Sequence, residues 1–152
     1  MFRYLISDVD GVLTDGGFYY SEQGKILKKF GPHDSDGFNL LKNHGIEPVA
    51  ITADKRGFEI SKKRLSDMGI ACFLVPAETR CKWISEKFDT TKTIFVGDGY
   101  FDIECIKKVE LGIAPQNAPH IVKQSADFVT ESHGGNGVIL EIALELMKNG
   151  KL

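Results

Sequence analysis

Two aspartates, Asp8 and Asp10, stand one residue apart where the first apolar stretch of the chain ends and a glycine follows. Residues 3–7 are rich in strand-forming side chains, so the pair is expected at the end of a buried strand. Carboxylates this close repel each other and lose hydration on burial, and a cation between them would stabilise the pair. In open parallel sheets, ligands bind at the carboxyl ends of the strands. The pair therefore predicts a reactive site, with an acidic turn as the ordinary alternative.

Further polar side chains close later strand-like stretches. Thr52 ends the second predicted core strand, Asp98 follows the fourth, and Asp102 lies one helical turn beyond Asp98. Because parallel strands present their carboxyl ends on one edge, these groups can converge. Clustered carboxylate oxygens favour Mg²⁺ over zinc, and a hydroxyl with a lysine or arginine nearby indicates a bound phosphoryl group. Each residue alone also has a structural interpretation: Thr52 as a turn cap, Asp102 in a first helical turn, and Lys82 as a solvated helix residue.

The elements that must position these groups alternate along the chain. Strands are predicted at residues 3–7, 47–52, 70–75, 93–96, 111–114 and 128–130, and helices at 38–44, 56–68, 78–88, 103–109 and 138–147. Strand and helix alternating at this spacing imply parallel strands with right-handed crossovers. The predicted fold is α/β, a Rossmann-like doubly wound parallel sheet in a single domain of residues 1–152.

A β-hairpin is predicted between the first and second core strands. Residues 17–20 and 26–30 flank residues 21–25, which contain a glycine suited to a turn. A lone two-stranded hairpin is marginal in water, and this one is rich in aromatic residues. We therefore expect it to protrude and pack on something else, such as another subunit.

Composition narrows the class of protein. The chain has 152 residues, of which 42% are hydrophobic, which is enough for a sizeable core. A net charge of -2 gives no reason to expect nucleic acid or an anionic membrane as a partner. Cys72, Cys81 and Cys105 lack metal-site spacing and are expected to be free thiols in a reducing compartment. With no membrane-spanning or signal-like segment, a soluble cytoplasmic protein is expected.

Several motifs together resemble the haloacid dehalogenase superfamily of phosphohydrolases. The motifs are D-V-D-G-V-L-T-D-G at residues 8–16, I-T at 51–52 and G-D-G-Y-F-D at 97–102. The hairpin, D-S-D-G at 34–37 and G-G-N-G at 134–137 resemble its small capless branch. That branch contains 3-deoxy-manno-octulosonate 8-phosphate phosphatase and nonulosonate 9-phosphate phosphatases. The resemblance covers nearly the whole chain and depends on the motifs occurring in order.

The resemblance implies a role for each acidic residue. Asp8 would be the nucleophile that forms an aspartyl-phosphate, and Asp10 would protonate the departing sugar oxygen and then accept a proton from water. Thr52 would hydrogen-bond a phosphoryl oxygen. Mg²⁺ would be held by Asp8, the Asp10 main-chain carbonyl and Asp98. Asp102 is the fourth residue of the predicted metal site, and it is expected to orient metal-bound water or the catalytic lysine rather than to bind metal directly.

The same resemblance implies a phosphorylated sugar acid as substrate and a homotetramer. In the family, the hairpin and the glycine-rich stretch belong to a tetramer in which neighbouring subunits close the active site in place of a cap. Contacts to the sugar are expected from loops, and His33, Lys55, Arg56 and Arg64 are candidates, although each is typical of a surface residue.

Three motifs depart from the family pattern. The fourth motif of the family often reads Gly-Asp-Asp, whereas this chain has Gly97-Asp98-Gly99 and so lacks one acidic group. The second motif usually continues Thr-Gly-Arg, whereas Thr52 is followed here by Ala53 and Asp54, which alters the substrate-facing loop. The third motif should be a lysine near the start of the helix after the third strand. Lys82 is the first choice, Arg80 fits the distance from the strand at least as well, and Lys87 lies further into the helix.

Two other functions remain open. A mutase or phosphotransferase could use the same aspartate, but it needs a cap to exclude water, and no insertion is long enough to form one. A non-catalytic oligomerisation module associated with nucleotide-sugar synthesis is the alternative from a different class. Retention of Asp8, Asp10 and Asp98 favours the enzyme, because unneeded buried carboxylates are costly.

Overall fold

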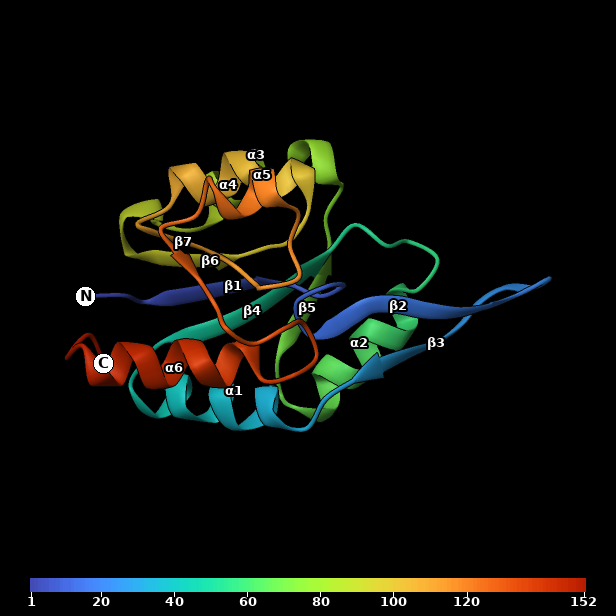
Figure 1. Ribbon diagram of the computed structural model, residues 1–152, viewed down its shortest axis with the longest axis horizontal. Helices are drawn as coiled ribbons and strands as arrows, with labels where there is room; N and C mark the ends of the chain where they lie inside the picture. The colour runs from blue at the N-terminus through green and yellow to red at the C-terminus, as the bar shows by residue number, and fades with distance from the viewer.

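A six-stranded sheet lies between two layers of helices in the computed structural model, which describes residues 1–152 (Figure 1). In spatial order, the strands are β5 (Ala71–Leu74), β4 (Glu47–Thr52), β1 (Tyr4–Asp8), β6 (Thr93–Val96), β7 (Leu111–Ala114) and β8 (Phe128–Val129). All neighbouring strands are parallel. The predicted doubly wound sheet without a cap domain is therefore confirmed.

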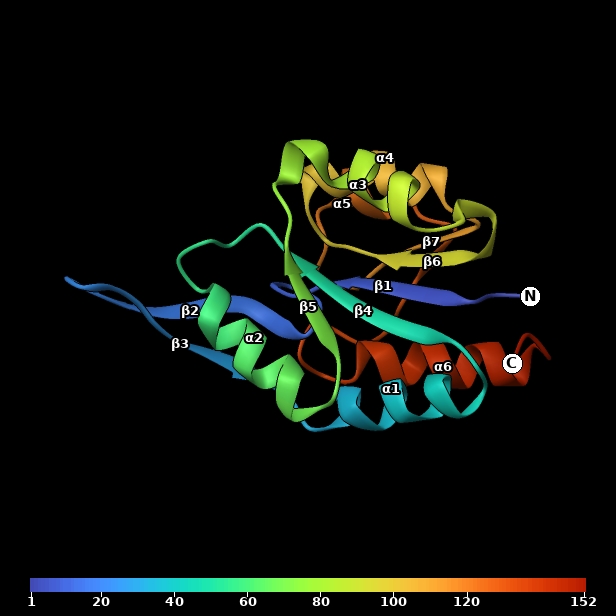
Figure 2. The ribbon, with the colours of Figure 1, turned by 180° about the vertical axis from the view of Figure 1, so that it is seen from behind.

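Helices cover both faces of the sheet, as the two opposite views show (Figures 1 and 2). One layer contains α1 (His33–Asn43), α2 (Phe58–Asp67) and α6 (Val138–Lys148), and the other contains α3 (Arg80–Lys87), α4 (Ile103–Lys108) and α5 (His120–Lys123). Short 3₁₀ turns precede α3 and α4. None of the helices has the length and apolar character needed to cross a membrane.

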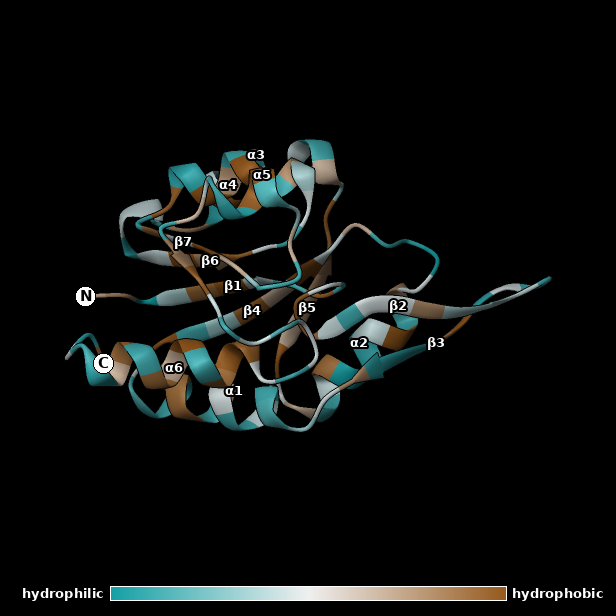
Figure 3. Ribbon diagram, viewed as in Figure 1, coloured by the Kyte–Doolittle hydropathy of each residue, from teal (hydrophilic) through white to brown (hydrophobic).

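Strand β1 shows why the sheet needs both layers. Successive side chains of a strand point to opposite faces, and Leu5 and Ile6 are both fully buried, each in a different apolar cluster. A strand buried on both faces is typical of a parallel sheet covered by helices. The hydropathy colouring agrees, with apolar residues concentrated in the strands between the layers (Figure 3).

Several predicted boundaries need correction. Strands β4, β6 and β7 have the predicted bounds, but α1 begins at His33 rather than at residue 38. The stretch predicted as one helix at 78–88 is a 3₁₀ turn, Ala77–Thr79, followed by α3. Helix α5 was not predicted, because four residues are too few to give a helical apolar pattern.

The hairpin formed by β2 (Thr14–Ser21) and β3 (Gly24–Phe30) is a separate antiparallel sheet that projects from the body (Figure 1). Both strands are longer than predicted. Five large apolar side chains on it are exposed: Phe18, Tyr19, Tyr20, Ile26 and Leu27. The base of the hairpin lies against α2, so part of it is covered by its own chain and the rest is free.

Helices α1 and α6 meet at a glycine. Asp34, near the start of α1, is buried and accepts a hydrogen bond from the Ile139 N–H at 3.0 Å, although burial raises its pKa to about 6. One turn further, Gly37 is so close to α6 that a Cβ atom there would lie 2.7 Å from the Ile139 carbonyl oxygen. The two helix backbones can approach this closely only because residue 37 has no side chain.

We predict that Gly37→Ala destabilises the protein by about 1–3 kcal/mol, as overpacked sites do. A loss of stability would indicate a steric clash with α6, because replacing Gly by Ala inside a helix normally stabilises the helix. Urea unfolding measures the change, with Asn39→Ala, an exposed site on the same helix, as control. Equal or greater stability of Gly37→Ala would contradict the close contact between α1 and α6.

Candidate active site

Three aspartates meet at the carboxyl edge of the sheet. Asp8 ends β1, Asp98 follows β6, and Asp102 lies in the 3₁₀ turn before α4. Each can offer one carboxylate oxygen such that the three oxygens lie within 4.8 Å of one another. Asp8 and Asp102 are buried, and Asp98 is half-buried. Such a set of oxygen donors fits a hard divalent cation.

The cluster carries unfavourable negative charge. Burial, followed by repulsion from Asp102, raises the pKa of Asp8 well above its ordinary value. The same two causes raise the pKa of Asp98 to about 6. Both shifts mean that the site disfavours a full set of ionised carboxylates without added positive charge. A bound divalent cation would supply that charge.

Arg80 is the cation that the chain itself places in this cluster. Its guanidinium is ion-paired with Asp102 and lies 3.5 Å from an Asp8 oxygen. Burial alone would lower the pKa of Arg80, but these two carboxylates outweigh burial and raise it. The 3₁₀ turn Ala77–Thr79 ends directly before this residue, so Arg80 is the first residue of α3, and its side chain is buried.

The other two candidate cations for the third motif lie outside the site. Lys82, the first choice from the sequence, has a side chain that is 78% exposed and lies 3.8 Å from Glu86. Lys87 is exposed and stacks over the Trp83 ring. Two residues along a helix turn the side chain by more than half a circle, so Arg80 and Lys82 cannot both face the sheet edge.

Asp10 and Thr52 form the other side of the site. Thr52 is buried at the end of β4, and its hydroxyl donates to an Asp10 oxygen at 3.3 Å. The same hydroxyl accepts a hydrogen bond from the Asp54 N–H at 3.1 Å. Thr52 therefore caps the following turn, as its structural interpretation expected, and also contacts a candidate catalytic carboxylate. The Asp10 side chain lies outside the group of three aspartates.

Two lysines of the hairpin reach into the site, and sequence reasoning missed them. Lys28 lies 2.8 Å from one Asp10 oxygen and 3.0 Å from the other, and Lys25 lies 2.6 Å from Asp54. The contacts to the two lysines outweigh partial burial and lower the pKa of Asp54 to about 2. Alternation places Lys28 on the same strand face as Phe30, but a shift of the hairpin register between Tyr19 and Tyr20 interrupts the alternation before Lys25.

The glycine-rich stretch near the end of the chain supports the catalytic loop. Asn117 donates from its amide nitrogen to the Gly11 carbonyl at 2.9 Å and accepts from the Gly134 N–H at 2.6 Å. These bonds join the loop after β1 to the segment before α6. Asn117 was not singled out in the sequence, since its role depends on two segments far away along the chain.

None of the residues suggested as sugar contacts forms a hydrogen bond or an ion pair with Asp8, Asp98 or Asp102. His33, Lys55 and Arg56 are exposed. Arg64 is half-buried and donates to the Gly31 carbonyl at 3.3 Å. Their role as sugar contacts stays a prediction.

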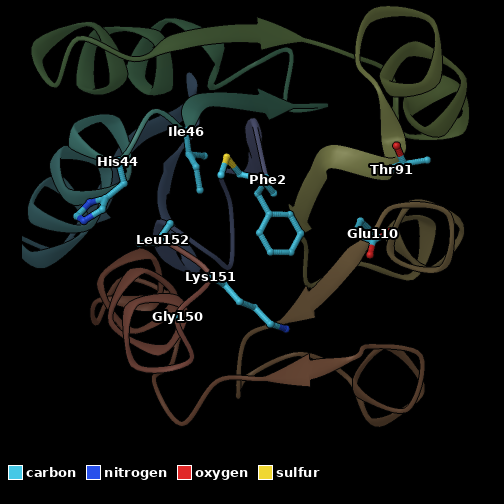
Figure 4. A pocket seen from close by; sticks show the side chains of 9 residues that line it. Phe2, His44, Ile46, Thr91, Glu110, Gly150, Lys151 and Leu152 are labelled. Atoms are coloured by element: carbon cyan, nitrogen blue, oxygen red, sulfur yellow. The ribbon is translucent and has the colours of Figure 1, made fainter.

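A well-defined cavity lies at the opposite end of the sheet. It has a volume of about 490 Å³ and is lined by residues just before the parallel strands, including Phe2, Ile46, Thr91 and Glu110 (Figure 4). It contains none of the clustered aspartates. Ligands of such sheets bind at the carboxyl ends of the strands, so this cavity is not the candidate active site.

Comparisons with known proteins agree with this geometry. Residues 84–142 match the family of haloacid dehalogenase-like hydrolases. The 3-deoxy-D-manno-octulosonate 8-phosphate phosphatase of Haemophilus influenzae is 31% identical over 98% of this chain and 85% of its own length. The corresponding protein of Escherichia coli K12 is 31% identical over 99% of this chain and 82% of its own length.

Two solved structures have the same fold. The cobalt-bound phosphatase of H. influenzae superposes with a TM-score of 0.85 at 31% identity, over 99% of this chain and 90% of its own. The enzyme of Moraxella catarrhalis, in complex with magnesium, phosphate and 3-deoxy-D-manno-octulosonate (KDO), superposes with a TM-score of 0.87 at 25% identity, over 99% of this chain and 89% of its own.

We predict that Arg80→Met lowers the free energy of unfolding by about 3–5 kcal/mol, because it leaves buried carboxylates without their partner. Lys82→Met, the matched control, should change it by less than about 0.5 kcal/mol, since its side chain is in water. Urea unfolding without divalent cations measures both. Equal losses for the two variants would refute the assignment of Arg80 as the buried countercharge.

Proposed function

Because this chain belongs to the haloacid dehalogenase superfamily, in its capless branch of 3-deoxy-D-manno-octulosonate 8-phosphate phosphatase relatives, we propose that it hydrolyses a phosphorylated sugar acid with Mg²⁺. The chain is a phosphatase by family. The proposal adds the substrate class, a 3-deoxy-octulosonate 8-phosphate or nonulosonate 9-phosphate, and the metal. The observation that carries it is the convergence of Asp8, Asp98 and Asp102 beside Arg80 at the carboxyl edge of the sheet.

In this proposal Asp8 and Asp10 divide the chemistry. An Asp8 oxygen attacks phosphorus, and the bond from phosphorus to the sugar oxygen breaks while Asp10 donates a proton to that oxygen. Water then attacks the phosphorus of the aspartyl-phosphate, Asp10 accepts its proton, and the bond to Asp8 breaks to release phosphate.

The remaining residues bind and orient. The Thr52 hydroxyl, whose single proton is donated to Asp10 in this structure, is proposed to donate it to a phosphoryl oxygen when substrate binds. Arg80 is proposed to offset charge beside the nucleophile. Asp102 holds Arg80 and accepts from the Gly99 N–H at 2.9 Å, so its role is orientation. Mg²⁺ held by Asp8, Asp98 and the Asp10 carbonyl would neutralise the repulsion between nucleophile and phosphate.

A panel of sugar phosphates, including octulosonate 8-phosphate and nonulosonate 9-phosphates, tests the reaction and the substrate together. We predict phosphate release from one of these acids that falls below detection without Mg²⁺ and in Asp8→Asn. A nucleophile is indispensable, so the loss should exceed about 10³-fold.

Asp127→Asn, at a carboxylate remote from the aspartate cluster, controls for changes in net charge. Turnover that survives in Asp8→Asn or is indifferent to Mg²⁺ would reject the mechanism. Turnover confined to sugar phosphates without a carboxylate would reject the substrate class.

We extend the proposal to a homotetramer held by the hairpins. Tyr19 and Leu27 are cross-strand partners and are 67% and 58% exposed. An exposed apolar surface of this kind is typical of a protein interface. Sugar contacts from a neighbouring subunit would then complete a site that has no cap.

We predict that Ile26→Asp dissociates the assembly, because a charge buried in an apolar interface is costly. Ile121→Asp is the matched control, since both isoleucines are 51% exposed and only the first lies on the hairpin. Sedimentation velocity distinguishes them. A monomeric wild type, or equal dissociation of both variants, would count against hairpin assembly.

A further inference from the structure

The ammonium group of Lys28 contacts four oxygen atoms, which belong to three residues. Its side chain is fully buried, and its ammonium lies 2.8 Å from Asp54 and 2.8 Å from the Ser61 hydroxyl, in addition to both oxygens of Asp10. An ammonium has three donors, and a buried one is stable only when each is used. The donors of Lys28 are therefore committed to groups of the chain.

The space for this lysine is built from the loop after Thr52. A Cβ atom at Gly57 would lie 2.6 Å from the Lys28 Cε and 2.9 Å from the Lys25 Cδ. Gly57 is buried, so any side chain there would push against both lysine stems. The two lysines of the hairpin therefore pack against this loop and against α2, in which Ser61 accepts a hydrogen bond from Lys28.

The contact with Asp10 is two-sided. Lys28 holds both carboxylate oxygens at 2.8 and 3.0 Å, and the Thr52 hydroxyl donates to one of them. Because Lys28 contacts both oxygens, it restricts the rotation of the carboxyl group by itself, and it would continue to do so when the single Thr52 proton is donated to a phosphoryl oxygen. Proton transfer requires the acid to lie within hydrogen-bonding distance of its target, so orientation decides its rate.

We propose that Lys28 is a positioning residue that aims Asp10 at the leaving-group oxygen. The inference rests on the proposed function, in which Asp10 is the general acid. The alternative is that Lys28 only anchors the hairpin to the body. Its contacts with Asp54 and Ser61 would suffice for anchoring, and the two contacts with Asp10 are the observation that goes beyond it.

Leaving groups separate these roles. Departure of a sugar hydroxyl needs a proton from Asp10, whereas p-nitrophenolate leaves readily without one. Because kcat/KM reports steps up to departure of the leaving group, a misaimed acid affects the two substrates differently. We predict that Lys28→Met lowers kcat/KM at least about 10-fold for the sugar phosphate and less than about 3-fold for p-nitrophenyl phosphate.

Lys29→Met, at the exposed neighbouring lysine, is the matched control and should leave both values unchanged. Ser61→Ala, which removes one acceptor and keeps the charge, should show a smaller loss with the same preference for the aryl substrate. It serves as the test if Lys28→Met fails to fold, as judged by circular dichroism and thermal unfolding.

Equal losses for both substrates would assign Lys28 to anchoring and overturn the inference while leaving the proposed function intact. No loss in folded Lys28→Met would do the same. A wild type that hydrolyses neither substrate with Mg²⁺ would remove the proposed function itself, and with it the acid that Lys28 is inferred to aim.

Discussion

The structure depends on keeping buried carboxylates together at one edge of a sheet. Asp8, Asp98 and Asp102 are brought there by the ends of β1 and β6, where burial and mutual repulsion oppose their ionisation. Arg80 provides one compensating charge from α3, on the other side of the sheet from the hairpin. The cluster still holds more negative than positive charge, which is the condition under which a divalent cation binds. Metal binding and stability at this edge are thus two results of the same electrostatic balance.

A second balance of charge lies beside the first. Asp10 and Asp54 face Lys25 and Lys28, so the two negative groups there meet two positive ones from the hairpin. The hairpin is therefore tied to the site by ion pairs at its base, while its outer part exposes aromatic and aliphatic side chains. One element connects the candidate general acid with the surface proposed for assembly.

Local patterns predicted the parts of the fold that depend on short-range physics. Continuous apolar runs correctly predicted the bounds of β4, β6 and β7. Polar residues at the strand ends indicated the edge of the sheet at which Asp8, Asp98 and Asp102 converge. The start of α1 was misplaced because its first turn contains Asp34, which is buried and accepts a hydrogen bond from α6 that no local pattern indicates.

The site residues that the sequence left undecided, or did not indicate, depend on tertiary placement. Spacing from the strand left Arg80 and Lys82 both open, since the 3₁₀ turn before α3 sets which of them faces inward. The local sequence does not distinguish Lys28 from the other lysines of the hairpin. Only the tertiary structure, in which Gly57 leaves space for its side chain, brings Lys28 to Asp10.

The most direct test of the central claim is to trap the covalent bond to Asp8. Asp10→Asn, mixed with Mg²⁺ and p-nitrophenyl phosphate, should accumulate aspartyl-phosphate, because this leaving group departs without an acid while hydrolysis still lacks its base. Borohydride reduction followed by mass spectrometry should then find homoserine at position 8. Release of nitrophenol with an unmodified position 8, or modification of another carboxylate, would contradict the account.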